Sequence, residues 1–159
     1  MFKILVATDG SGYAFQAIDY VRNLAERIAD CEITLVNVAD TTSLPVSLAS
    51  TNLPETGWVT VDVERGIEAL IKQMEAESNK ILEDSRSKLL AIEKPVYLIS
   101  LKGSPWKMIC DLAEKENFDL LVMGSRGRGR VAGLLMGSIS EKVLHCSTSP
   151  VLIIRGQKE

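Results

Sequence analysis

The stretch Met123-Gly-Ser-Arg-Gly-Arg-Gly-Arg-Val-Ala-Gly-Leu-Leu-Met-Gly-Ser138 leaves one apolar run and enters a helical pattern, which predicts a strand, a loop and the start of a helix. The apolar run before it has four counterparts elsewhere in the chain. The five runs are Ile4–Thr8, Ile33–Val38, Val96–Ser100, Leu120–Met123 and Val151–Ile154. They are rich in β-branched residues and leucine and are nearly continuous, which is typical of strands buried on both faces of a parallel sheet.

Amphipathic patterns lie between these runs. Apolar stripes at spacings of three and four predict a first helix around Phe15–Ile28 and a longer second one around Ile67–Ile92. A third helix begins at Ser104-Pro105, where Ser is a suitable cap and Pro suits the first turn. The fourth runs from about Ser138 to His145, and its opening Ser138-Ile-Ser-Glu141 has the spacing of a capping box. This alternation predicts an α/β fold with an open, doubly wound sheet and right-handed crossovers.

Size and composition are those of one globular domain. The chain has 159 residues, 46% hydrophobic and 25% charged, so we expect a single domain over residues 1–159. Residues 40–61 carry two prolines and many Ser and Thr without a clean period, which predicts a long variable loop. The net charge of −3 argues against non-specific nucleic-acid binding. No stretch approaches the roughly 18 apolar residues of a membrane span.

Cysteine usage points to a reducing compartment. Cys31, Cys110 and Cys146 are scattered without metal-ligand spacing, and an odd count does not indicate a disulfide framework. We therefore expect small, mostly buried free thiols. The N-terminal apolar run is too short for a signal peptide and lacks a small-residue cleavage site. The resulting prediction is a cytoplasmic protein.

The glycine-rich stretch is the candidate site. Ligands of open parallel sheets bind at the carboxyl ends of the strands, where this stretch lies. Gly124 and Gly127 would let the backbone approach a phosphate, and the last helix offers unpaired N–H groups and positive potential near Gly137 and Ser138. Arg126 would add a charge-assisted hydrogen bond. The alternative is a loop that merely connects strand to helix, because glycine spacing alone is weak evidence.

Longer motifs support the first interpretation. The spacing Gly124-x2-Gly127-x9-Gly137-Ser138 resembles the nucleotide-binding motif of the ATP-binding branch of the universal stress protein family. Three further segments are similar to hallmarks of that family: Ile4-Leu-Val-Ala-Thr-Asp-Gly-Ser11, Asp119-Leu-Leu-Val-Met-Gly-Ser-Arg-Gly127, and Gly137-Ser-Ile-Ser-Glu-Lys-Val-Leu-His145 with Pro150-Val-Leu-Ile. The resemblance covers almost the whole chain, residues 40–61 being the least informative part.

The resemblance implies a Rossmann-like, five-stranded parallel sheet in the order 3-2-1-4-5 and a homodimer that pairs through Val151–Ile154. It implies a stress-response regulatory protein, a nucleotide-dependent switch that binds ATP, AMP or another adenine nucleotide. Whether a divalent ion such as Mg or Mn bridges the phosphates stays open. The alternative is a slow ATPase or phosphotransferase, although no catalytic residue is identified. The implied contacts are Ala7, Thr8, Asp9 and Val38 at the adenine, Met123 and Gly124 at the ribose, and Arg126, Gly127, Gly137, Ser138, Ile139 and Ser140 at the phosphates.

Several of these side chains have a plain structural alternative. Asp9 is either a polar ligand contact or a cap for the first helix, for which Ser11 is equally suited. Ser138 has the same two roles at the last helix. Arg128 and Arg130 are expected in a solvated loop, and the single histidine, His145, on a surface. Trp58 and Trp106 are expected to pack, with Trp58 as an alternative cover for the nucleotide or a partner.

Overall fold

The computed structural model of the chain describes residues 1–42, 59–128 and 136–156. Strands and helices alternate along these ranges: β1 (Phe2–Ala7), α1 (Gly12–Ala25), β2 (Cys31–Asp40), α2 (Val59–Ser87), β3 (Val96–Gly103), α3 (Pro105–Lys115), β4 (Leu120–Gly124), α4 (Ser138–Cys146) and β5 (Val151–Ile154). The strands form one parallel sheet in the order β3-β2-β1-β4-β5. The predicted fold class and strand order are therefore confirmed.

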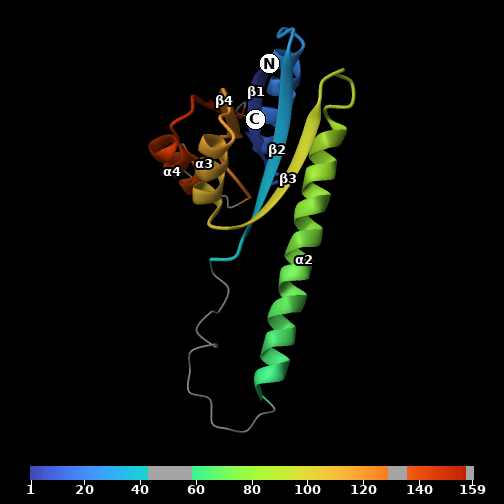
Figure 1. Cartoon of the computed structure of the whole chain (residues 1–159), viewed down its shortest axis with the longest axis vertical. Helices are drawn as coiled ribbons and strands as arrows, with labels where there is room; N and C mark the ends of the chain where they lie inside the picture. The colour runs from blue at the N-terminus through green and yellow to red at the C-terminus, as the bar shows by residue number, and fades with distance from the viewer. Residues whose placement is uncertain (43–58, 129–135, 157–159) are drawn as a thin grey trace.

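Helices cover both faces of the sheet because its central strands are apolar on both faces. In β1, Ile4 and Val6 pack with α1 and the end of α2, whereas Leu5 and Ala7 pack with α3 and α4. All four side chains are buried. Figure 1 shows α3 and α4 to the left of the sheet and α2 to its right. This burial on two sides explains why the strands read as continuous apolar runs rather than alternating ones.

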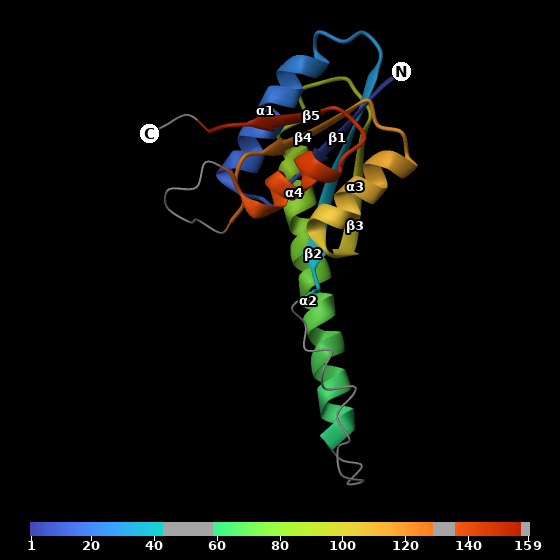
Figure 2. The same cartoon turned by 90° about the vertical axis from the view of Figure 1, so that its left-hand side faces the viewer.

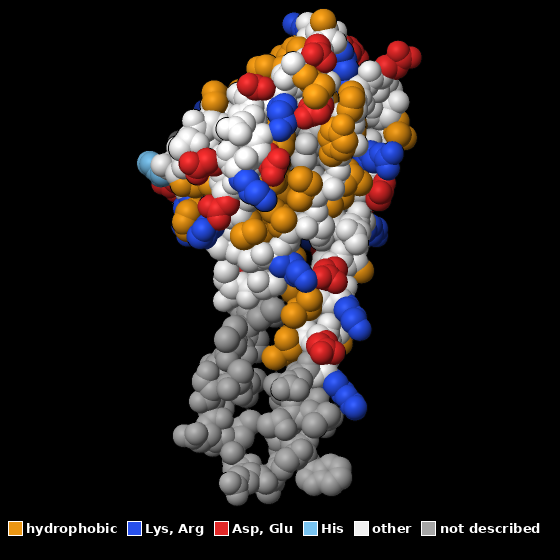
Figure 3. Space-filling view, in the orientation of Figure 1, with side chains coloured by type: hydrophobic (Ala, Val, Ile, Leu, Met, Phe, Trp, Pro, Cys, Tyr) orange, Lys and Arg blue, Asp and Glu red, His pale blue; other side chains and the backbone are white. Residues whose placement is uncertain are grey.

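The long helix α2 has two different halves. It spans 29 residues, about 44 Å at 1.5 Å per residue, and its N-terminal half extends beyond the end of the sheet (Figures 1 and 2). Its buried side chains lie in the C-terminal half, at Ser78, Ile81, Leu82 and Ser85. Figure 3 shows hydrophobic side chains along one side of the projecting half and charged ones along the other. Among the side chains of α2 that the structure describes, the buried ones therefore join the core through the C-terminal half of the helix.

The predicted loop over residues 40–61 is wrong at both ends. Asp40 still belongs to β2, because it pairs with Gly103 of the neighbouring β3, and α2 begins already at Val59. Residues 43–58, with Trp58, lie outside the described residues. Pairing with a distant strand extends β2 where local composition favours a turn, and this is a tertiary effect that periodicity does not reveal.

The expectation of three free thiols is wrong for two of them. Cys110 of α3 and Cys146 of α4 form a disulfide, with their Cα atoms 6.5 Å apart. Cys31 is a free, buried thiol, as expected. The two bonded residues are separated by 36 positions in the sequence and meet only because α3 and α4 lie side by side on one face of the sheet.

Helix starts follow the sequence signals only in part. Ser104 is the N-cap residue of α3 and Pro105 follows it, but the Ser104 side chain accepts no capping hydrogen bond. At α1, Ser11 is the cap, because its Oγ accepts from the N–H of Ala14 at 3.2 Å. In the described part of the chain, no helix is both long and apolar enough to cross a bilayer.

Candidate functional site

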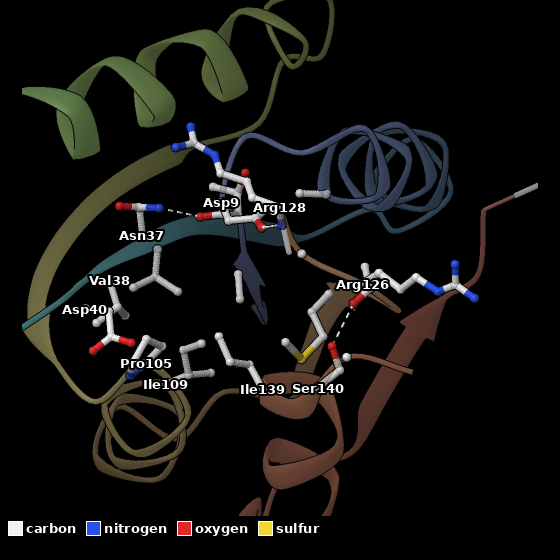
Figure 4. A pocket seen from close by; sticks show the side chains of 18 of the residues that line it. Asp9, Asn37, Val38, Asp40, Pro105, Ile109, Arg126, Arg128, Ile139 and Ser140 are labelled. Atoms are coloured by element: carbon white, nitrogen blue, oxygen red, sulfur yellow. Dashed lines mark hydrogen bonds between the residues drawn. The ribbon is translucent and has the colours of Figure 1, made fainter. Parts of the chain in front are cut away.

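The carboxyl ends of β1, β2 and β4 open into a cavity of about 450 Å³. Parallel pairing aligns these ends, since Ala7 lies opposite Val36 on one side and Met123 on the other. The loops after these strands and the first turns of α3 and α4 surround the space (Figure 4). The cavity is lined by all twelve residues that the sequence analysis assigned to a nucleotide: Ala7, Thr8, Asp9, Val38, Met123, Gly124, Arg126, Gly127, Gly137, Ser138, Ile139 and Ser140.

One side of the cavity is apolar. Val36 and Val38 of β2, Pro105 and Ile109 of α3 and Ile139 of α4 line it, and Figure 4 shows four of them along one side of the space. Such a slot accepts a flat ring while polar groups at its ends set the orientation. Sequence reasoning missed Val36 and Ile109, because each belongs to an apolar run or stripe that predicts core and nothing more. It also missed Pro105, which indicates the start of a helix and nothing more.

Asp9 links the loops that follow β1 and β4. Its Oδ1 accepts from the N–H of Ser11 at 3.0 Å, and its Oδ2 accepts from the N–H of Arg128 at 2.9 Å. Because Ser11 is the α1 cap, the capping alternative for Asp9 is wrong. The carboxylate lies on the side of the cavity opposite Ile139 and Ser140 of α4 (Figure 4). It therefore supplies a negative end to a cavity whose other end is the positive start of a helix.

A buried polar chain runs from this cavity to α2. The Nδ2 of Asn37 donates to the backbone oxygen of Thr8 at 2.7 Å, and the hydroxyls of Thr8 and Ser85 lie 3.0 Å apart. Asn37 is 6% exposed and Thr8 is 5% exposed. Asn37 was missed as a cavity residue, as was Asp40 at the end of the same strand. An asparagine inside an otherwise apolar strand run was the available signal, because a buried amide needs partners.

The glycines are needed for packing as well as for open space. A Cβ added at Gly124 would lie 2.7 Å from the backbone carbon of Tyr13 in α1, and one at Gly127 would lie 2.7 Å from Oδ2 of Asp9. At Gly137 the nearest atom would be the Cα of Arg126 at 3.4 Å, which is an ordinary contact. Gly124 and Gly127 thus allow the loop to approach α1 and Asp9, a structural role that glycine spacing alone does not reveal.

The start of α4 faces the cavity without a side-chain cap. The predicted capping box is wrong: Gly137, not Ser138, is the N-cap residue, and no side-chain oxygen makes the capping hydrogen bond. The Gly137 N–H donates to Ser125 O at 2.7 Å and the Ser140 hydroxyl donates to Gly124 O at 3.0 Å. Ser140 therefore anchors the helix to β4. Within the described residues, the N–H groups of the next three positions, 138–140, have no backbone acceptor, as expected for a first helical turn.

The two described arginines of the loop make contacts with different helices. Arg126 lines the cavity with its backbone, but its guanidinium points away from it (Figure 4) and lies 5.9 Å from the centre of the Tyr13 ring. Arg128 is exposed, as predicted, but it also lines the cavity and forms an ion pair with Glu77 of α2. The loop is thereby connected to the long helix. Arg130 lies outside the described residues.

The remaining candidates contribute little to the cavity. His145 is exposed near the end of α4, as expected, and Trp106 packs against the α3 and α4 side of the core. Among the described residues, no group of three His, Cys, Asp or Glu side chains is close enough together to hold a metal ion.

Known proteins resemble the chain over nearly its whole length. The sequence model of the universal stress protein family matches residues 1–155. The universal stress protein YxiE of Bacillus subtilis is 34% identical over 155 residues, which is 96% of this chain and 98% of YxiE. The solved structure of MJ0577, whose sequence is from Methanocaldococcus jannaschii, superimposes with a TM-score of 0.79 at 26% identity, covering 99% of this chain and 97% of that one. A universal stress protein of Arabidopsis thaliana with AMP bound shares the fold, with a TM-score of 0.67 at 19% identity and coverage of 99% and 93%.

Proposed function

Because the chain belongs to the universal stress protein family, we propose that it binds an adenine nucleotide, in the first place ATP, in the cavity at the carboxyl ends of β1, β2 and β4. One observation carries the proposal: the same cavity has an apolar slot on one side and an uncapped helix start on another. An apolar slot suits a purine ring, and an uncapped helix start suits a phosphate group. On this proposal the whole of residues 1–159 forms one nucleotide-binding domain.

Charge sets the direction of the bound nucleotide. The carboxylate of Asp9 would repel phosphate and accept from an exocyclic amine or a ribose hydroxyl, so the nucleoside lies between Asp9 and Val38. The phosphates lie against the first turn of α4, at Ser138 and Ile139, whereas Gly127, which the resemblance places at the phosphates, lies beside the Asp9 carboxylate. AMP in the Arabidopsis relative is in keeping with this class of ligand. The glycine pattern of the ATP-binding branch supports a longer phosphate chain.

The proposed role is that of a nucleotide-dependent switch in a homodimer. A ligand shifts such an equilibrium only through different affinities for the two states. Asp9 holds the backbone of Arg128, and Arg128 pairs with Glu77, so the phosphate loop is connected to α2. Occupancy would thus change the position of a helix whose N-terminal half projects from the sheet. The edge strand β5, half-buried in the single chain, is the proposed dimer contact.

Calorimetric titration with ATP and Ser138→Asp tests the proposal. We expect wild-type protein, confirmed to be nucleotide-free, to bind with a dissociation constant below about 100 μM, or about −5.5 kcal/mol. Ser138 is exposed at the start of α4, where an acidic residue stabilises the helix by about 0.3–1 kcal/mol. The same carboxylate repels phosphate, so affinity should fall at least about tenfold while the fold is retained.

The matched control is Asn23→Asp, which adds the same charge on an exposed position of α1 away from the cavity. It should leave ATP affinity unchanged. Absence of ATP binding by the wild type, or equal loss in both variants, would show that the cavity is not a phosphate site. A single-turnover hydrolysis assay distinguishes the proposed switch from the alternative, a slow ATPase or phosphotransferase. Binding without turnover supports the switch.

A further inference from the structure

The Cys110–Cys146 disulfide encloses the segment that carries the phosphate side of the cavity. The segment from Cys110 to Cys146, a sequence separation of 36, contains β4, the described part of the glycine-rich loop and α4. Cys110 follows Ile109, which lines the apolar slot, and Cys146 is the last residue of α4. The bond therefore fastens one wall of the cavity to the helix that forms the other.

Other described contacts also hold α4 in this position, including the Lys142 ammonium, which lies 5.9 Å from the centre of the Trp106 ring of α3. Ser140 donates its hydroxyl to Gly124 O, and the buried Val143 packs in the cluster shared with α3 and β4. The hydrogen bond lies at the first turn of the helix and the disulfide at the last residue. With both in place the helix is held at its two ends. Without the disulfide, its C-terminal end keeps only side-chain packing and the short connection to β5, which is paired with β4.

We propose that this cysteine pair is a redox-modifiable site that controls nucleotide affinity, the disulfide form binding ATP more tightly than the dithiol form. The inference rests on the proposed function, because it concerns the same cavity. Reduction frees α4 to move relative to α3, so the N–H groups at 138–140 and the apolar slot beside Ile109 lose their common alignment. Binding must then order the helix again, and affinity falls by the free energy of that ordering.

The chemistry requires an external thiol or dithiol reductant. A thiolate attacks Sγ of Cys146, which is half-buried, whereas Cys110 is 9% exposed. The sulfur–sulfur bond breaks, a mixed disulfide forms on Cys146, and Cys110 leaves as a thiolate that takes up a proton. A second thiol resolves the mixed disulfide, so two thiols are oxidised to one disulfide while Cys110 and Cys146 gain two electrons and two protons. Low-molecular-weight thiols and protein dithiols both belong to this class.

The test compares ATP binding by the oxidised and the reduced full-length chain. Alkylation and intact mass identify the state of the pair, and a phosphine reductant produces the dithiol form. We expect reduction to weaken ATP binding by at least about fivefold, the lower end of common coupling between sites. By reciprocity, saturating ATP should make the reduction potential of the pair more negative by about 21 mV, because tenfold corresponds to about 30 mV for two electrons.

Two variants separate the pair from other thiols. Cys31→Ala removes the free thiol and should keep the full response to reductant. The double variant Cys110→Ser/Cys146→Ser should bind ATP like the reduced wild type in both conditions. Should that variant fail to fold, the wild-type comparison still decides. Equal ATP affinity in the two states, or cysteines that remain unpaired after oxidation, would overturn the redox inference but not the proposed function. Absence of ATP binding in both states would overturn both.

Discussion

The substitution Gly124→Ala isolates the packing role of the phosphate loop. The last residue of β4 lies against the first turn of α1, and an added Cβ would be 2.7–2.9 Å from three atoms of Tyr13, two of them backbone. Real Cβ atoms do not approach backbone so closely, so α1 or β4 must shift. Overpacking of this kind costs about 1–3 kcal/mol. With about 2–4 °C per kcal/mol for a chain of this size, we expect the Tm to fall by about 6 °C.

Gly137→Ala is the matched control, since both glycines border the same loop. Its Cβ would meet its three nearest atoms at 3.4–3.7 Å, and the backbone there, with φ −78° and ψ 152°, suits any residue. The remaining cost is that of alanine at an N-cap position, less than about 1 kcal/mol, or about 3 °C or less.

Thermal unfolding of nucleotide-free protein by circular dichroism measures both variants. Ligand must be absent, because bound nucleotide would stabilise the variants unequally. A Gly124→Ala protein that unfolds at the wild-type temperature would refute the reasoning, since α1 and β4 would then have room between them. Equal loss in the two variants would also refute it, because it would assign the effect to the loop as a whole rather than to contact with Tyr13.

Two further predictions concern single side chains. Thr8→Val leaves the fully buried Ser85 hydroxyl without its partner, so we expect a loss of about 1–3 kcal/mol. Adding Ser85→Ala should recover part of that loss in thermal unfolding, and a double variant less stable than Thr8→Val would contradict this. Because the Arg126 guanidinium points away from the cavity, Arg126→Ala should change ATP affinity by less than about threefold, or ~0.65 kcal/mol. A loss of about tenfold in titration would mean that the side chain turns inward to the phosphates.

The fold was predictable because each strand and each helix has a recognisable pattern in its own stretch of sequence. The strands β1, β2 and β4 are largely continuous apolar runs, which is the pattern of strands covered by helices on both faces, whereas the edge strand β3 alternates more exposed with more buried residues. The predicted nucleotide contacts came from the family resemblance, which assigned them residue by residue. They line one cavity because the carboxyl ends of β1, β2 and β4 meet at one edge of a parallel sheet.

Properties that depend on how elements dock were decided by the tertiary structure. Asp9 holds the backbone of Arg128 across 119 positions, and Cys110 reaches Cys146 across 36. Gly124, at the end of β4, is required by the close approach of Tyr13 in α1. None of these contacts can be predicted from a periodic pattern or a motif in the sequence, because the packing of whole helices on the sheet determines which residues meet. Local sequence determines which elements form and which groups they carry, whereas the distances between those groups arise only once the core is assembled.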